Sequence, residues 1–326
     1  MINNLQFLRA FAAISVVLFH IIDSVVTYSL DTTWLNFLAG WGALGVDLFF
    51  VISGFVMLHA QLQHRLSPSV FLQKRLIRIV PMYWGLTALV VLIYLLFPAI
   101  FRELQINESW AISSFAFMSW FWIDKHPVVY VGWTLEWEIL FYVLFAISLW
   151  INKIRSQLVM LTSGLVLLAI SSQHLIIIEF LFGIFAAYLY HFHRPARKVG
   201  WTLLLVGVGL FLATLHAKYR MLAFDLSLYR TLIWGVPAFF VVLGASVIGQ
   251  LRWSSLTYLG NASYSIYLLQ MLSIPVFYKG MLLITPELPT DVLALGCLVF
   301  TVVAGCIVYT ILEKPLTKTL QQKFSG

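Results

Sequence analysis

The chain has 326 residues, of which 61% are hydrophobic and only 10% are charged, and its formal net charge is +7. A soluble domain carries about 25% charged residues, so this composition excludes an ordinary water-soluble domain. The sequence predicts a single integral membrane domain over residues 1–326, with an all-α polytopic fold. We expect no nucleic-acid partner, because orientation in a membrane explains the basic excess.

Ten apolar stretches are long enough to cross a bilayer as helices, which needs about 20 residues each. The first stretch carries Arg9 and has no small-x-small cleavage site, so we interpret it as a retained helix rather than a signal peptide. Cys297 and Cys306 lie too far apart on one expected helix to form a disulfide. The ten expected spans are residues 5–28, 36–60, 81–101, 132–151, 157–172, 175–192, 200–217, 231–249, 257–278 and 292–312.

Basic residues are distributed unevenly between the loops that connect these spans. Cytoplasmic loops of membrane proteins carry an excess of Lys and Arg. With both termini in the cytoplasm, most of the 20 Lys and Arg fall on the inner side, and the outer loops hold most of the loop acids. The pattern therefore predicts an N-in and C-in orientation. The basic residues left for the outer side are Arg102, Lys125, Lys218, Arg220, Arg230 and Lys279.

Two ionisable residues, Arg9 and His20, lie inside the first apolar stretch. Their spacing makes about three helical turns, so both side chains face the same way, about 16 Å apart along the axis. Ionisable groups at membrane depth are functional candidates, so we expect Arg9 near the cytoplasmic face and His20 in the outer third to belong to a site. The alternative is that Arg9 reaches the inner surface and His20 is a satisfied core residue.

Three acidic residues lie in other apolar spans. Glu138, in VGWTLEWEILFY, is expected at a depth close to that of His20, and Tyr142 can share its face one turn later. We interpret Glu138 as a partner of the imidazole or as a structural hydrogen-bonding residue. For Asp47 we expect a structural or positioning role. Glu179 is either a second carboxylate of the same site or a helix-pairing residue.

The segment QKRLIRIVPMYW, residues 73–84, is expected to be an inner loop that carries Arg75 and Arg78. If the segment is helical, both arginines lie on one face. Paired guanidinium groups match the oxygens of phosphates. The alternative is ordinary positive-inside charge in contact with lipid headgroups. No spacing typical of metal ligands stands out, so we expect no metal.

Phosphate-binding groups on the inner side and an acid–base pair on the outer side fit a ligand with a phosphate-rich head and a long thin arm. An acyl-coenzyme A has this form, with a reactive thioester at the tip. A histidine can accept the proton of a hydroxyl that attacks a carbonyl, and a carboxylate can hold the imidazole in the required tautomer. The residues therefore suggest acyl transfer across a membrane.

An ordered series of motifs resembles the membrane-bound acyltransferase 3 family, in particular its exopolysaccharide and O-antigen O-acetyltransferase branch. The resemblance covers nearly the whole chain. It rests on the Arg-x10-His pair of Arg9 and His20, GVDLFFVISGF at 45–55, KRLIRIVPMYW at 74–84, GWTLEWEILFY at 132–142, YLGNASYSIYLLQ at 258–270 and EKPLTK at 313–318.

The resemblance implies O-acylation of an extracytoplasmic glycan, or of a lipid-linked glycan, by acyl-CoA from the cytoplasm, with acetyl-CoA as the expected donor. It implies that His20 is the essential histidine, that Arg9, Arg75 and Arg78 serve the acyl-CoA side and that Glu138 serves the outer side. It also implies a multi-pass protein of the bacterial inner membrane, in contact with membrane lipids and with polysaccharide assembly proteins.

One position departs from the resembled pattern, because the motif that often ends in histidine ends here in Gln270. A role for that position is therefore open. The aromatic outer loop 102–131 is a candidate surface for sugar rings, with an interfacial aromatic belt as the alternative. A transporter or flippase of polysaccharide precursors is the rival function, because intramembrane Arg, His and Glu also form proton relays. An inactive scaffold of an assembly complex is a third possibility.

Overall fold

The computed structural model describes residues 2–28, 30, 34–101, 105–285 and 287–324, and these residues are mostly helical with no β-strand among them. Within these ranges nine helices are long and apolar enough to cross a membrane, and a pair of helices bent by 99° supplies a tenth. The prediction of an all-α multi-pass membrane protein with about ten spans is therefore confirmed. Of the expected outer cations, Arg102 lies outside the described residues.

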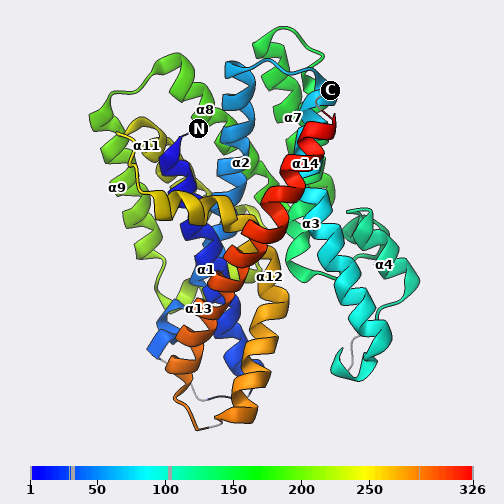
Figure 1. Cartoon of the computed structure of the whole chain (residues 1–326). Coiled ribbons are helices and arrows are strands. Elements are labelled where there is room, and N and C mark those ends of the chain that lie inside the picture. The colour runs from blue at the N-terminus through cyan, green and yellow to red at the C-terminus, as the bar shows by residue number, and fades with distance from the viewer. Residues whose placement is uncertain (1, 29, 31–33, 102–104, 286, 325–326) are drawn as a thin grey trace.

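The spans are built from long helices joined by short 3-10 and π-helical turns (Figure 1). The long helices are α1 (Asn3–Thr27), α2 (Leu44–Gln63), α3 (Pro68–Leu96), α6 (Trp133–Ser148), α7 (Ile154–Ser172), α8 (Glu179–Tyr188), α9 (Arg197–Ala213), α11 (Val236–Val247), α12 (Ser254–Ile284), α13 (Thr290–Val308) and α14 (Lys314–Phe324). The shorter elements are η1 (Trp34–Leu38), η2 (Trp41–Ala43), η3 (Pro98–Phe101), α4 (Glu108–Phe115), α5 (Ser119–Ile123), η4 (Tyr130–Gly132), η5 (Leu175–Ile178), η6 (Leu189–His193), η7 (Ala217–Phe224), α10 (Leu228–Arg230), η8 (Thr231–Gly235) and η9 (Tyr309–Glu313).

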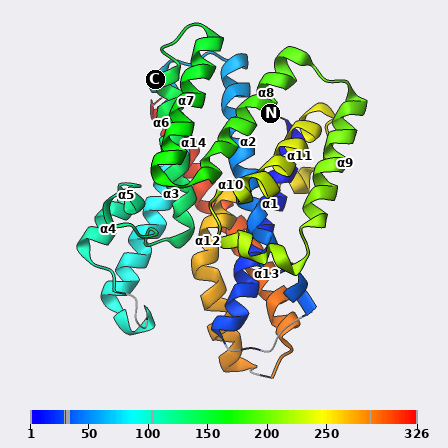
Figure 2. The ribbon, with the colours of Figure 1, turned by 180° about the vertical axis from the view of Figure 1, so that it is seen from behind.

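Helix α1 runs through the middle of the bundle and packs against α12, α2 and α13 (Figure 2). Both described chain ends lie toward the same end of the bundle (Figure 1). This agrees with termini on one side of the membrane, and the assignment of that side to the cytoplasm stays a prediction. Arg9 thus lies toward the end that holds the termini, and His20 lies about 16 Å further along the α1 axis.

The backbones of α2 and α8 approach each other closely because two glycines face one another. A Cβ on Gly54 would meet the backbone of α8 at Phe180, and a Cβ on Gly183 would meet the backbone of α2 at Val51. Only glycine permits such close approach. Asp47 lies two turns before Gly54, and Glu179 lies one turn before Gly183. The glycine contact therefore brings the two acidic side chains to the same interface.

The segment expected to be an inner loop, residues 73–84, is part of one continuous helix instead. Helix α3 begins at Pro68, a favourable first position, and continues through Pro81 to Leu96. A proline inside a membrane helix is tolerated where neighbours satisfy the freed backbone group. Arg75 and Arg78 are therefore carried by a helix, less than one turn apart, and the expected span beginning at residue 81 begins earlier.

Helices α4 and α5 form a small extension beside the far end of α3 (Figures 1 and 2). The side chain of Asn107 caps α4 by accepting a hydrogen bond of 2.8 Å from the backbone N–H of Trp110. Two side chains of α3 fasten the extension, because the Tyr83 hydroxyl donates to the Ser114 carbonyl and the Trp84 indole donates to the Phe115 carbonyl. The extension is thus an ordered part of the fold.

Candidate active site

A cavity lies between α1, α2, α3, α6 and α12. We call it the arginine cavity, because Arg9 of α1 and Arg78 of α3 line it. Its other polar lining residues are Ser53, Thr134, Glu138, Tyr142, Ser263, Tyr264 and Tyr267.

The cations of the arginine cavity are not neutralised by direct contacts. Arg75 lies within electrostatic reach of Arg78, Glu138 and Tyr142, and its guanidinium lies 5.5 Å from the centre of the Phe71 ring. Among the described residues, none of the guanidinium groups of Arg9, Arg75 and Arg78 forms an ion pair. Three partly buried guanidinium groups with free N–H donors form a suitable site for an anionic ligand.

Two carboxylates face these arginines. Glu138 accepts hydrogen bonds from the hydroxyls of Ser53, at 2.7 Å, and Tyr142, at 2.5 Å. Glu313, in the π-helical turn η9, accepts from the Ser265 hydroxyl and interacts electrostatically with Arg9 and Arg78. Counted formally, three cations therefore face two carboxylates. Glu313 belongs to the motif EKPLTK but was not predicted from the sequence as a site residue.

His20 lines a different cavity, which we call the histidine cavity. The His20 ring lies 4.8 Å from the Phe19 ring and 6.1 Å, edge to face, from the Tyr130 ring, measured between centroids. Within the described residues, neither nitrogen of the His20 imidazole takes part in a hydrogen bond. The imidazole is therefore free to exchange a proton with a bound group. The other polar lining residues of this cavity are Asp23, Ser24, Tyr130 and Gln270.

A smaller cavity lies between the arginine and histidine cavities. It shares Val46 and Tyr267 with the arginine cavity, and it shares His20 and Tyr130 with the histidine cavity. The three cavities therefore form a row along α1, from the arginines to His20. The hydroxyl of Tyr267, at the shared wall, donates a hydrogen bond of 2.9 Å to the Val131 carbonyl.

The structure brings Glu138 to the arginines and not to His20. Helix α6 begins at Trp133, so Glu138 lies more than one turn inside it and lines the arginine cavity with Tyr142. Tyr130, in the turn η4 that precedes α6, takes the place beside His20. The contacts of Glu138 are those of a hydrogen-bonding residue on the arginine side, and none of them reaches the imidazole.

Asp47 and Glu179 belong to a separate buried cluster around Arg230. The Arg230 side chain is 1% exposed and holds both Asp47 oxygens, at 3.1 and 2.8 Å. Its remaining N–H groups donate to the carbonyls of Ala43, Leu222, Ala223 and Asp225. Glu179 lies against Asp47 and packs on Gly235. These contacts favour the structural role expected for Asp47 and place Glu179 in the same cluster, away from Arg9.

Arg230 was expected among the cations of the outer side, but it lies inside the protein. A signal for this position was present in the sequence, because a buried carboxylate such as Asp47 needs a cationic or hydrogen-bonding partner. Asp23 was not predicted as a site residue either, although it follows His20 by three positions, on the same face of α1. Among the described residues, no three His, Cys, Asp or Glu side chains converge on a common point suited to a metal ion. Cys297 and Cys306 are free, as expected.

Most aromatic residues of the described part of the outer loop pack against the protein. The Trp120 ring lies 4.3 Å from the His174 ring, and the Trp110 indole donates to the His126 carbonyl. Burial lowers the pKa of His126, and the neighbouring His174 lowers it further. Burial also lowers the pKa of His174, although the hydrogen bond of its ring to the Ser172 carbonyl acts in the opposite direction and raises it. The expected sugar-binding role of this loop stays a prediction.

Residues 2–311 of the chain match the family model described as an acyltransferase domain, Acyl_transf_3. The chain belongs to this acyltransferase family. It is therefore an acyltransferase as well as a multi-pass membrane protein. No solved structure is significantly similar to it.

Three relatives in the acyltransferase family have names that describe their activity or role. The chain is 32% identical over 272 residues to the exopolysaccharide production protein ExoZ of Rhizobium meliloti (strain 1021), covering 78% of this chain and 83% of ExoZ. It is 30% identical over 187 residues to the putative peptidoglycan O-acetyltransferase YrhL of Bacillus subtilis (strain 168), covering 51% of this chain and 27% of YrhL. It is 28% identical over 198 residues to the O-acetyltransferase OatA of Staphylococcus aureus (strain NCTC 8325 / PS 47), covering 55% of this chain and 30% of OatA.

Proposed function

We propose that this protein is an O-acyltransferase of the bacterial inner membrane that acts as a single membrane domain over residues 1–326. It takes an acyl group, with acetyl as the expected one, from acyl-CoA at the cytoplasmic side. It delivers the group to a hydroxyl of an extracytoplasmic or lipid-linked glycan. The observation that carries the proposal is a row of neighbouring cavities along α1, with Arg9 and Arg78 lining the first and His20 lining the last.

The arginine cavity suits the phosphate-bearing head of acyl-CoA. Arg9 and Arg78 line it, and Arg75 lies close enough to add its charge. Guanidinium groups bind phosphate oxygens by paired, charge-assisted hydrogen bonds. Phosphates would replace Glu138 and Glu313 as the main anions facing the three arginines. The residues therefore fit the donor, and membrane lipid headgroups are the competing anions at the same surface.

The narrow middle cavity suits the thin arm and thioester of the donor. Its walls, which include Val46 and Tyr267, are mostly apolar, and it ends at His20. Desolvation of this kind keeps bulk water, the competing acyl acceptor, away from a thioester. The distance of about 16 Å along α1 between Arg9 and His20 sets the length that the donor must span.

His20 acts as the general base. Its imidazole accepts the proton of an acceptor hydroxyl while the hydroxyl oxygen bonds to the acyl carbon. The carbon–sulfur bond then breaks, and the departing sulfur takes up a proton from the imidazolium, so the imidazole returns to its neutral form. Relay of the acyl group through the His20 nitrogen is a second route to the same products. General acid–base groups of this kind contribute about 100-fold to 10,000-fold to a rate.

Glu138 and Tyr142 act on the donor side in this proposal. The Glu138 carboxylate is fixed by the hydroxyls of Ser53 and Tyr142. It lies within electrostatic reach of Arg9 and Arg75. It therefore orients the guanidinium groups between rounds of donor binding. Asp47 positions the outer ends of α2 and α10 through Arg230.

The names of the relatives guide the choice of acceptor and acyl group. ExoZ is named for exopolysaccharide production, and YrhL and OatA are named as O-acetyltransferases. The alignment with ExoZ covers most of both chains. We therefore propose an exopolysaccharide, an O-antigen or a similar glycan as acceptor, acetyl-CoA as donor and polysaccharide assembly proteins as partners.

The decisive experiment measures transfer of labelled acetyl from acetyl-CoA to glycan by the purified protein in lipid nanodiscs. The acceptor is polysaccharide from a deletion host, treated with mild alkali to remove its O-acetyl groups. Label in the glycan that requires both the protein and acetyl-CoA is the expected result. Absence of label, together with altered polysaccharide export in the deletion host, would instead support the transporter hypothesis.

A further inference from the structure

The histidine cavity contains polar groups that the proposed chemistry does not use. Besides His20, it is lined by the Asp23 carboxylate, the Tyr130 hydroxyl and the Gln270 amide. These groups come from α1, from η4 before α6 and from α12. Ser24 is different, because its hydroxyl already donates to the His20 carbonyl.

Gln270 is the most informative of these residues. Its side chain is 1% exposed, and its Nε2 donates a hydrogen bond of 2.8 Å to the Tyr267 carbonyl. A carbonyl can only accept, so the nitrogen of the amide must face it and the oxygen must face the other way. Among the described residues, Oε1 of Gln270 is buried without a partner. A buried acceptor without a partner is unfavourable, and a hydrogen-bond donor on a ligand would remove that cost.

Asp23 adds a second acceptor at the same place. It lies three residues after His20, so its carboxylate projects from the same face of α1. Its charge interacts with Tyr130, and no described residue donates a hydrogen bond to it. The free imidazole of His20 and the free hydroxyl of Tyr130 complete the group. The cavity is therefore rich in hydrogen-bond acceptors around the reacting nitrogen.

Among the described residues that line the histidine and middle cavities, the cation is Arg230, and it is already occupied. Arg230 lines the adjoining middle cavity, but Asp47 and backbone carbonyls take up its hydrogen bonds. A guanidinium has five N–H donors, and those of Arg230 are all directed to these groups. It has no donor left for a carboxylate on a ligand. Asp23 would in addition repel such a carboxylate.

We propose that Asp23 and Gln270 form the acceptor subsite beside His20, and that this subsite selects a neutral, hydroxyl-rich sugar over an acidic one. The inference rests on the function proposed above and deepens it by naming the acceptor class. The sugar donates its hydroxyl protons to the Gln270 oxygen and to the Asp23 carboxylate. These two hydrogen bonds hold the ring so that a third hydroxyl reaches the imidazole of His20.

Kinetics with separate KM values for the two substrates test the subsite. The probes are labelled acetyl-CoA and the de-O-acetylated polysaccharide of a deletion host. Gln270→Leu is expected to raise the KM for polysaccharide about threefold to tenfold, the effect of one lost hydrogen bond, and to leave the KM for acetyl-CoA unchanged. Gln270→His, which retains a ring nitrogen as acceptor, is expected to stay within about threefold of the wild type.

A matched control separates binding from folding. Gln157, on α7, is another buried glutamine. Its Nε2 donates a hydrogen bond to the Ser148 hydroxyl at the end of α6, and it does not line the histidine cavity. In the folded fraction of the Gln157→Leu variant, the KM for polysaccharide is expected to equal that of the wild type. A rise in the KM for acetyl-CoA in Gln270→Leu, or equal effects of both leucine variants on the KM for polysaccharide, would overturn the assignment of Gln270.

Competition by fragments tests the selection by charge. Short fragments of the same polysaccharide compete with the intact acceptor, either as they are or after oxidation of their primary alcohols to carboxylates. Neutral fragments are expected to inhibit the wild type at least about tenfold more strongly than the oxidised, acidic fragments do. The Asp23→Asn variant is expected to reduce this ratio of inhibition by neutral to acidic fragments about tenfold. Asp291→Asn is the control for loss of a carboxylate elsewhere. If the ratio is unchanged in Asp23→Asn, the proposed role of Asp23 is wrong.

Failure of this proposal and failure of the proposed function give different results. If His20→Ala abolishes transfer while the Asp23 and Gln270 variants match the wild type in both KM values, the enzyme is an acyltransferase and the subsite is wrong. If the wild type transfers no acetyl from acetyl-CoA, the proposed function itself is wrong.

Discussion

Arg9 and His20 project from the same stripe of α1, about 16 Å apart along its axis, and each lines a different cavity. A third cavity lies between them and shares lining residues with each, including His20. In the proposed function, one continuous helix thus carries a donor-binding residue at one end and the general base at the other. Substitutions at its two ends should therefore affect different kinetic constants.

Replacing His20 should remove the chemistry and leave the fold. In a deletion host complemented with His20→Ala, we expect the O-acetyl signals in the NMR spectrum of the surface polysaccharide to fall about 100-fold or more, because the variant lacks the proposed general base. His64→Ala, at an exposed position after α2, should restore the wild-type spectrum. Wild-type O-acetylation by a well-expressed His20→Ala protein would refute the mechanism.

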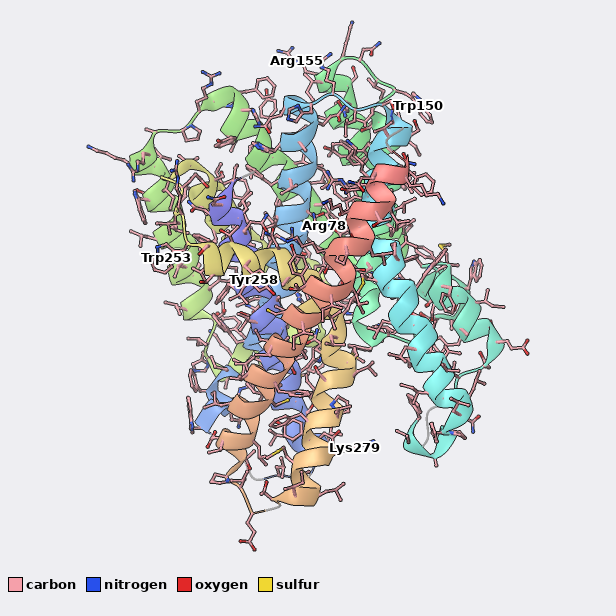
Figure 3. The ribbon with its side chains drawn as sticks, viewed as in Figure 1. Arg78, Trp150, Arg155, Trp253, Tyr258 and Lys279 are labelled. Atoms are coloured by element: carbon pink, nitrogen blue, oxygen red, sulfur yellow. The ribbon has the colours of Figure 1, made fainter. Side chains whose placement is uncertain are left out.

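Replacing the arginines should weaken use of the donor. Arg78 lies about half-way along the length of the bundle, whereas Arg155 lies at its end (Figure 3). We expect Arg78→Gln to raise the KM for acetyl-CoA about tenfold to 100-fold, the range for one charge-assisted contact, with the KM for glycan unchanged. Arg78→Lys should be intermediate, because lysine keeps the charge and loses the paired geometry. Arg155→Gln should match the wild type, and a similar effect at Arg155 would point to general surface charge.

The spacing of Arg9 and His20 could be predicted because it depends only on local helix geometry. Helix α1 is continuous from Asn3 to Thr27, so the sequence distance fixes both the face and the separation. Depth in the membrane was a weaker guide. Glu138 was expected near His20, but the start of α6 at Trp133 puts it with the arginines and puts Tyr130 beside the histidine.

The partners of buried charges could not be read from the sequence. Arg230 and Asp47 are 183 positions apart, and their pairing depends on how α2, α8 and α10 pack. The position of Arg230 near the outer end of a span made it look like a loop cation. In the sequence, Gln270 is notable only because it departs from a motif. The buried Oε1 without a partner, which suggests a role for Gln270, is seen only in the folded structure.

Breaking the buried ion pair should destabilise the protein. Arg230 and Asp47 are 1% and 0% exposed, so removing one partner leaves the other charge buried and unpaired. We expect Asp47→Leu to cost about 3–5 kcal/mol, and the double variant Asp47→Leu with Arg230→Met to recover most of this loss. Both effects are measured by thermal unfolding in detergent, with the fraction of protein that stays monodisperse as the readout. Additive losses in the double variant would show that the pair is not the source of the effect.

The position of Glu138 predicts a donor-side defect. We expect Glu138→Gln to change the KM for acetyl-CoA severalfold, because it alters the charge that faces Arg9 and Arg75. The pH dependence of kcat should keep its shape, since the described contacts of Glu138 do not include His20. Glu108→Gln, at an exposed position in α4, is the matched control. A displaced pH profile with an unchanged KM for acetyl-CoA would instead support Glu138 as the partner of the imidazole.

Acidic pH should loosen the outer loop around His126 and His174. Burial lowers the pKa of both imidazoles below the ordinary value of 6.5, so the unfolded loop binds more protons than the folded one as pH falls. The stability of this region is therefore complete above about pH 6.5 and is lost progressively below that value. We expect faster amide hydrogen exchange over residues 119–130 at pH 5.5 than at pH 7.5, after correction for the intrinsic exchange rate. His126→Gln should weaken this pH dependence, and an unchanged pH dependence would show that another group titrates.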